Sequence, residues 1–129
     1  MTEHTTITGE VIRGDGIGGK LGYPTANIDC APPALEDGVY AAFIWRGTTR
    51  YNGMMILGDH YRDTRAQKKV ELYLLDFSGD LYGENLRAEI VEIIRPFKQF
   101  TGTDALIAQI ERDCRQARNI FKQIDNANA

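Results

Sequence analysis

The chain has 129 residues, a formal net charge of −3 and a hydrophobic content of 43%. This length suits one domain with a substantial core, and the composition is that of an ordinary globular protein. The negative charge argues against nucleic acid as a partner, because phosphate backbones attract basic surfaces. A membrane-spanning helix needs about 18 consecutive apolar residues, and no stretch of the sequence comes close to this length. No signal peptide is recognisable. We therefore expect a cytoplasmic protein without membrane contact, with Cys30 and Cys114 reduced.

A predicted strand over residues 6–13 runs into a glycine-rich segment, residues 14–20, with the sequence GDGIGGK. This segment contains G-x-G-x-x-G and also G-x-x-x-x-G-K. The dinucleotide fingerprint needs a helix directly after it, which Gly22 and Pro24 forbid. A P-loop needs Ser or Thr where this chain has Leu21. Both motif interpretations are therefore rejected.

What remains is a candidate cradle for a phosphate and a metal ion. Glycine lets backbone N–H groups approach an anion closely, and Lys20 adds a positive charge. Pro24 keeps the chain extended, so that Thr25 and Asn27, two residues apart, point the same way. Both offer hard oxygen atoms, and Mg²⁺ takes one or two protein ligands beside substrate phosphates. The alternative is a surface turn in which both side chains hydrogen-bond to their own backbone.

The middle of the chain is rich in aromatic and β-branched residues. Residues 38–46 (GVYAAFIWR) and 50–57 predict two strands, and the turn at 47–49 joins them as a hairpin. The polar residues 58–69 predict a loop.

The next predicted strand, residues 70–77 (VELYLLDF), carries a carboxylate between two apolar faces. Alternation surrounds Glu71 with apolar side chains, so we expect it to be at least partly desolvated. A carboxylate in such a setting can accept a proton from a reacting hydroxyl. The alternative is a glutamate at a strand end, paired with an arginine.

A further strand is predicted over residues 86–95, after which the period changes. Apolar residues then recur every three or four positions, which predicts a helix over about 103–124, followed by a tail at 125–129. Thr103 is expected to be its N-cap, with Asp104 in the first turn. Because no long helix lies between the strands, we expect an antiparallel barrel with this helix packed on it.

Taken together, these pieces resemble the riboflavin kinase (flavokinase) family, which transfers the γ-phosphoryl group of ATP to riboflavin. The matching stretches are GEVIRG with the glycine loop, KLGYPTAN, GVY, VELYLLDFSGDLYG, IIRPFKQF and LIAQIERD, over about residues 7–121. The resemblance implies a mainly β fold, a six-stranded antiparallel Greek-key β-barrel with a C-terminal α-helix packed on it, in one domain over residues 1–129. It implies a monomeric ATP:riboflavin 5′-phosphotransferase with Mg²⁺ or another divalent cation as cofactor.

The resemblance also implies roles for individual residues. Glu71 would be the catalytic base that accepts the proton of the ribityl 5′-hydroxyl. Thr25 and Asn27 would bind magnesium and the ATP phosphates. The other nucleotide contacts would be Gly14, Lys20, Leu74, Asp76 and Tyr82, and the segment over the flavin would supply Arg95, Lys98 and Phe100.

The chain departs from the family pattern at residues 56–61 (ILGDHY), where the loop is altered. Many bacterial relatives also carry an FMN adenylyltransferase domain, for which 129 residues leave no room, so we expect no FAD synthesis. Two other functions stay open: a non-catalytic flavin- or nucleotide-binding barrel, and an interaction barrel without a small ligand. The presence of Thr25, Asn27 and Glu71 together favours the enzyme over the first, and the glycine loop favours it over the second.

Overall fold

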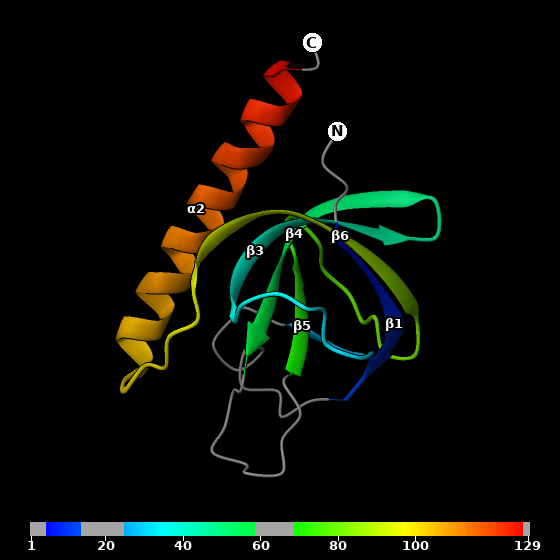
Figure 1. The fold of residues 1–129 in the computed structure, drawn as a ribbon, viewed down its shortest axis with the longest axis horizontal. Helices are drawn as coiled ribbons and strands as arrows, with labels where there is room; N and C mark the ends of the chain where they lie inside the picture. Colours follow the sequence, from blue (N-terminus) through cyan, green and yellow to red (C-terminus); the bar gives the residue numbers. More distant parts are fainter. Residues whose placement is uncertain (1–4, 14–24, 59–68, 128–129) are drawn as a thin grey trace.

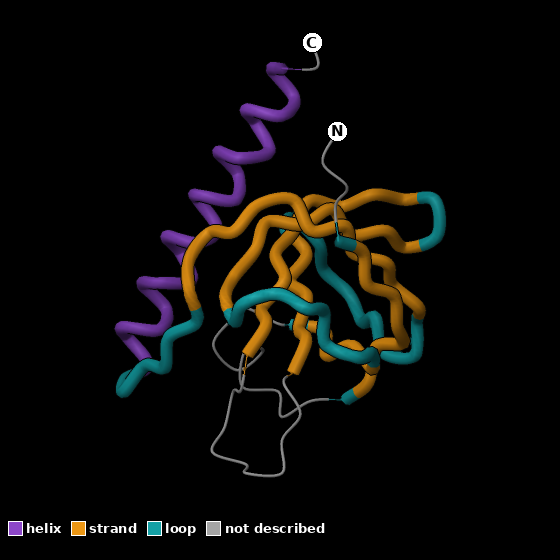
Figure 2. The backbone as a smooth tube through the Cα atoms, in the orientation of Figure 1, coloured by secondary structure: helices purple, strands orange, loops and turns teal. Residues whose placement is uncertain are grey.

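The computed structural model describes residues 5–13, 25–58 and 69–127. In this part of the chain, six strands close a barrel in the order β1-β2-β5-β4-β3-β6, and all neighbouring strands are antiparallel (Figures 1 and 2). The elements are β1 (Thr6–Ile12), β2 (Ala26–Asp29), β3 (Gly38–Arg46), β4 (Thr49–Gly58), β5 (Lys69–Leu74), β6 (Asn85–Pro96) and α2 (Thr103–Ala127).

The strand order is that of a Greek key. Strands β3, β4 and β5 are neighbours in sequence order, and β6 returns to lie beside β3. The predicted hairpin is confirmed, because β3 pairs with β4 from Gly38↔Leu57 to Arg46↔Thr49. Its turn contains Gly47 at a φ of 61°, a backbone conformation that glycine adopts without strain. The expected antiparallel barrel is therefore confirmed.

Two strand predictions need correction. The strand predicted over residues 70–77 is too long, because β5 ends at Leu74 and Asp76 turns the chain with a φ of 58°. The segment around Asn27, predicted only to be extended, is the full strand β2, paired with β1 on one side and with β5 on the other. Four residues are too few for a clear alternating pattern.

Helix α2 follows the predicted apolar pattern and continues three residues beyond the predicted end, to Ala127. Its first hydrogen bond runs from the Leu106 amide to the Gly102 carbonyl, so Gly102, rather than Thr103, occupies the N-cap position. Asp104 lies in the first turn, as predicted. In Figure 1 the helix lies along the outside of the barrel. No helix among the described residues is long and apolar enough to cross a membrane.

Among the described residues, the core forms two clusters on the two sides of the sheet. Val70, Leu72 and Leu74 of β5 belong to the cluster inside the barrel. The second cluster joins the outer face to α2, where the rings of Phe43 and Phe121 lie 5.3 Å apart between centroids. Side chains alternate along a strand, so Glu71 is on the outer face with the helix-facing cluster.

Candidate functional site

The site is built around Glu71, which lies within β5 and is only 9% exposed. Asn27 of β2 is its direct partner in the antiparallel register. Thr25 precedes β2, and its Oγ1 donates a hydrogen bond to Glu71 Oε2 at 3.3 Å. Directly paired residues of antiparallel strands project from the same face of the sheet. A hydroxyl, an amide and a carboxylate from two separate stretches of sequence therefore form one group, the Thr25–Asn27–Glu71 cluster.

The cluster combines a buried carboxylate with partly exposed neighbours. Thr25 and Asn27, which flank it, are both half-buried. The described residues contain no group of three His, Cys, Asp or Glu side chains that could hold a metal ion. The oxygen atoms of Thr25, Asn27 and Glu71 form a donor set that does not suit zinc, which prefers nitrogen and sulfur ligands. It fits Mg²⁺, which completes its shell with waters and phosphate oxygens.

The residues predicted to contact the nucleotide have different environments. The Leu74 side chain is 6% exposed and packs inside the barrel, so a ligand could meet only the backbone there. Asp76 is exposed and forms two hydrogen bonds with Arg118 of α2, at 2.9 and 3.0 Å. These bonds from the Arg118 guanidinium lower the pKa of the Asp76 carboxyl. Tyr82 is 52% exposed, with the Arg13 guanidinium 4.3 Å from the centroid of its ring.

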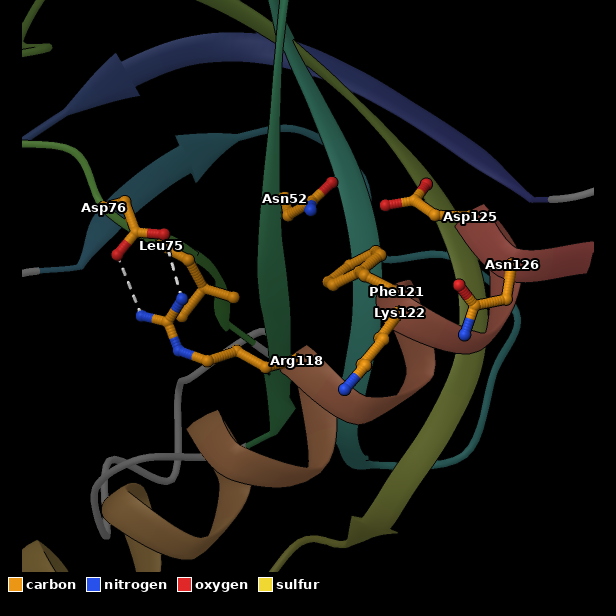
Figure 3. A pocket seen from close by; sticks show the side chains of 8 residues that line it. All are labelled: Asn52, Leu75, Asp76, Arg118, Phe121, Lys122, Asp125 and Asn126. Atoms are coloured by element: carbon orange, nitrogen blue, oxygen red, sulfur yellow. Dashed lines mark hydrogen bonds and ion pairs between the residues drawn. The ribbon is translucent and has the colours of Figure 1, made fainter. Parts of the chain in front are cut away.

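A pocket of about 390 Å³ opens beside the Asp76–Arg118 ion pair (Figure 3). Its lining combines this pair with the apolar Leu75 and Phe121 and with polar groups from the last turns of α2. Leu75 is four residues beyond Glu71, roughly 13 Å along an extended chain. The pocket is therefore distinct from the Thr25–Asn27–Glu71 cluster, and among the predicted site residues that the structure describes, Asp76 alone lines it.

The three residues predicted to lie over the flavin come together in one segment. The Phe100 ring centroid lies 5.7 Å from Arg95 Cζ and 5.4 Å from Lys98 Nζ. These distances suit cation–π contacts. Gly14 and Lys20, the remaining predicted contacts, lie outside the described residues.

Asp113 is a buried residue that the sequence analysis missed. It is 3% exposed in the middle of α2 and accepts hydrogen bonds from Arg95. The sequence does indicate that Asp113 is buried, because it is three residues after Ile110 and four before Ala117, on the apolar face of the helix. A carboxylate at such a position needs a buried partner.

Both cysteines are free thiols and partly buried. Burial raises the pKa of the Cys30 thiol and of the Cys114 thiol. A raised pKa lowers the thiolate fraction, so neither has the character of a nucleophile.

Comparisons with known proteins agree with the fold. The sequence model of the family described as "Flavokinase: Riboflavin kinase" matches residues 1–121. The chain is 35% identical over 127 residues to a bifunctional riboflavin kinase/FMN adenylyltransferase of Listeria monocytogenes, covering 94% of this chain and 40% of that protein. It is 34% identical over 121 residues to the RNA-binding riboflavin kinase RibR of Bacillus subtilis, covering 93% of this chain and 53% of that protein. The chain thus spans about half or less of the length of these relatives.

Two solved structures are also similar. A crystal structure described as a macrolide-efflux protein from Streptococcus pneumoniae gives a TM-score of 0.81 at 28% identity, over 90% of this chain and 39% of that one. Riboflavin kinase from Trypanosoma brucei gives 0.63 at 20% identity, over 91% and 79%, which shows the shared fold. The fold and the site define an antiparallel barrel with a polar cluster on its outer face. The chain belongs to the riboflavin kinase family.

Proposed function

We propose that the protein is a riboflavin kinase, which transfers the γ-phosphoryl group of ATP to the ribityl 5′-hydroxyl of riboflavin and gives FMN and ADP. Family membership supports the reaction class. The observation that carries the proposal is the convergence of Thr25, Asn27 and Glu71 at the start of β2, where it pairs with β5. Such a cluster has the parts that phosphoryl transfer needs, namely oxygen ligands for a cation and a carboxylate for the attacking hydroxyl.

Glu71 is the proposed base. The 5′-oxygen of riboflavin forms a bond to the γ-phosphorus, the bond from that phosphorus to the bridging oxygen breaks, and ADP leaves with the electron pair. The proton of the hydroxyl passes to the Glu71 carboxylate. The hydrogen bond from Thr25 to Oε2 holds this carboxylate in place.

Thr25 can serve the carboxylate and a metal ion at the same time. A hydroxyl has one hydrogen to donate and two lone pairs to offer. Thr25 can therefore donate to Glu71 and still present an oxygen lone pair beside the amide oxygen of Asn27. Mg²⁺ bound there would neutralise charge on the ATP phosphates.

The other predicted contacts remain part of the proposal. Gly14, Lys20, Leu74, Asp76 and Tyr82 belong to the nucleotide side, and Arg95, Lys98 and Phe100 to the flavin side. We propose one domain that acts as a cytoplasmic monomer. RNA binding, named for the Bacillus subtilis relative, is not part of the proposal, because the net charge of this chain is −3.

An assay for FMN tests the proposed function. The protein is incubated with riboflavin, ATP and Mg²⁺, and the products are separated by chromatography. Equal amounts of FMN and ADP are expected. Quenching of riboflavin fluorescence without FMN would favour a non-catalytic binding barrel, and the absence of both signals would favour an interaction barrel.

A further inference from the structure

The strongest unexplained feature of the described residues is the buried carboxylate of Asp113, which is 3% exposed. Burying such a group is costly unless it is paired and hydrogen-bonded. Arg95 Nε lies 2.8 Å from Oδ1 and Arg95 Nη2 lies 2.9 Å from Oδ2, a two-pronged contact. Gln109 Nε2 donates to Oδ1 at 2.9 Å. We call these three residues the Arg95–Asp113–Gln109 cluster.

The cluster fixes the orientation of Arg95 at the end of β6. Arg95 Nη1 also donates to the Pro96 carbonyl at 3.2 Å, so both ends of the guanidinium are held. In this orientation Arg95 Cζ lies 5.7 Å from the Phe100 ring centroid. Asp113 is therefore linked to the Phe100 side chain through Arg95. Arg95 and Phe100 lie on either side of the point where β6 ends and the connection to α2 begins; the connection itself is visible in Figure 1.

A second attachment holds the same connection to the barrel. The Phe97 amide donates to the Asp37 carbonyl at 3.2 Å. The Phe97 ring packs against Gly58 so closely that a Cβ on Gly58 would lie 2.5 Å from Phe97 Cδ2. This attachment holds the chain at Phe97, between Arg95 and Phe100.

We propose that Asp113 is a positioning residue for riboflavin: it holds Arg95, and through Arg95 it holds Phe100 against the flavin. The inference rests on the proposed function, which places Arg95, Lys98 and Phe100 on the flavin side. Asp113 itself is buried and touches no substrate. On the nucleotide side, Asp76 pairs with Arg118, and Tyr82 contacts Asp80 and Arg13, all outside this cluster. Loss of Asp113 therefore weakens riboflavin binding and leaves ATP binding unchanged.

The test is Asp113→Asn, which keeps the shape of the side chain and removes its charge. Riboflavin affinity is measured by quenching of flavin fluorescence without ATP, and KM is measured for both substrates. We expect the riboflavin Kd and KM to rise by about 10- to 100-fold, because the loss of one contact made by a charged group has an effect of this size on binding. The KM for ATP stays within about two-fold. Arg95→Lys gives the same split, because an ammonium group cannot form the two-pronged contact.

Glu84→Gln is the matched control. It makes the same carboxylate-to-amide change in another arginine pair, since Glu84 Oε1 lies 2.7 Å from Arg46 Nε. Arg46 is the last residue of β3, whereas the first residue, Gly38, pairs with Pro96. The control site is thus roughly 26 Å along β3 from the end of β6. Both KM values are expected to be unchanged in this variant.

If Asp113→Asn does not fold, Gln109→Ala provides the second test, because it removes one hydrogen bond and keeps the ion pair. A rise in riboflavin Kd without a change in the KM for ATP is again expected. An unchanged riboflavin Kd, or an equal rise in both KM values, overturns the positioning role while the proposed function stands. A wild-type protein that binds no riboflavin overturns the proposed function and this inference together.

Discussion

Replacing Asp113 by leucine is expected to destabilise the protein, whereas replacing Asp113 and Arg95 together is not. The single change leaves the Arg95 guanidinium in a mostly buried position without its partner, and it also removes the acceptor of Gln109. Breaking a buried pair in this way costs about 3–5 kcal/mol. The Arg95 side chain retains 19% exposure, so water can reach part of it. We therefore expect a loss at the lower end, about 3 kcal/mol.

For a domain of this size, about 3 kcal/mol corresponds to a fall in Tm of roughly 12 °C. The double variant Arg95→Met/Asp113→Leu replaces both charges by apolar groups, and its stability is expected to be within about 1 kcal/mol of the wild type. Urea unfolding followed by circular dichroism gives both free energies by linear extrapolation. Glu84→Gln, in a more exposed ion pair, should cause no measurable change. A single variant as stable as the wild type, or a double variant as unstable as the single one, would refute the reasoning.

Three further predictions concern the site and the thiols. Thr25→Val removes the hydrogen bond to Glu71 Oε2, and we expect kcat/KM to fall about ten-fold; Thr25→Ser, which keeps the hydroxyl, should stay near the wild type, and equal rates for the two variants would contradict the role of the hydroxyl. Asn27→Ala removes one oxygen ligand, so a magnesium titration of activity should shift to higher concentration; an unshifted curve would remove Asn27 from the metal site. Burial raises the pKa of the Cys114 thiol, so at about pH 8 native protein should react with a disulfide reagent more slowly than protein unfolded in urea; similar rates would contradict its burial.

The hairpin and the helix could be predicted because their signals are local. Residues 38–46 are rich in β-branched and aromatic side chains and are followed by a turn glycine, and the structure places β3 at those residues. The apolar spacing that predicted the helix places Ala117, Ile120 and Phe121 in the interface with the barrel. Both patterns depend on neighbours within a few positions, which the sequence displays directly.

Features that depend on distant partners were harder to predict. Strand β2 has four residues and is defined by pairing with β1 and β5, which no local pattern reveals. The strand predicted over residues 70–77 is too long because the positive φ of Asp76 turns the chain, although apolar residues lie on both sides of it. Asp113 was overlooked because its partner, Arg95, lies 18 positions earlier on another element.

The candidate site could be predicted only in part. Residue type predicted Thr25, Asn27 and Glu71 individually, and the register of β2 against β5 brings them together. Leu74 was predicted to contact the nucleotide, but its side chain points into the barrel. A contact at this position would therefore have to be made by the backbone. A role carried over from a sequence motif therefore does not say whether the side chain or the backbone performs it.

The most direct test of the account is the turnover of Glu71→Gln, measured beside its binding of riboflavin and ATP. Glutamine keeps the size of the side chain and can still accept a hydrogen bond from Thr25, but it is not a base at neutral pH. If Glu71 is the base, both substrates still bind and kcat falls by about 10²–10⁴-fold, while Glu84→Gln keeps wild-type turnover. An unchanged kcat in Glu71→Gln would contradict the claim that this cluster performs the phosphoryl transfer.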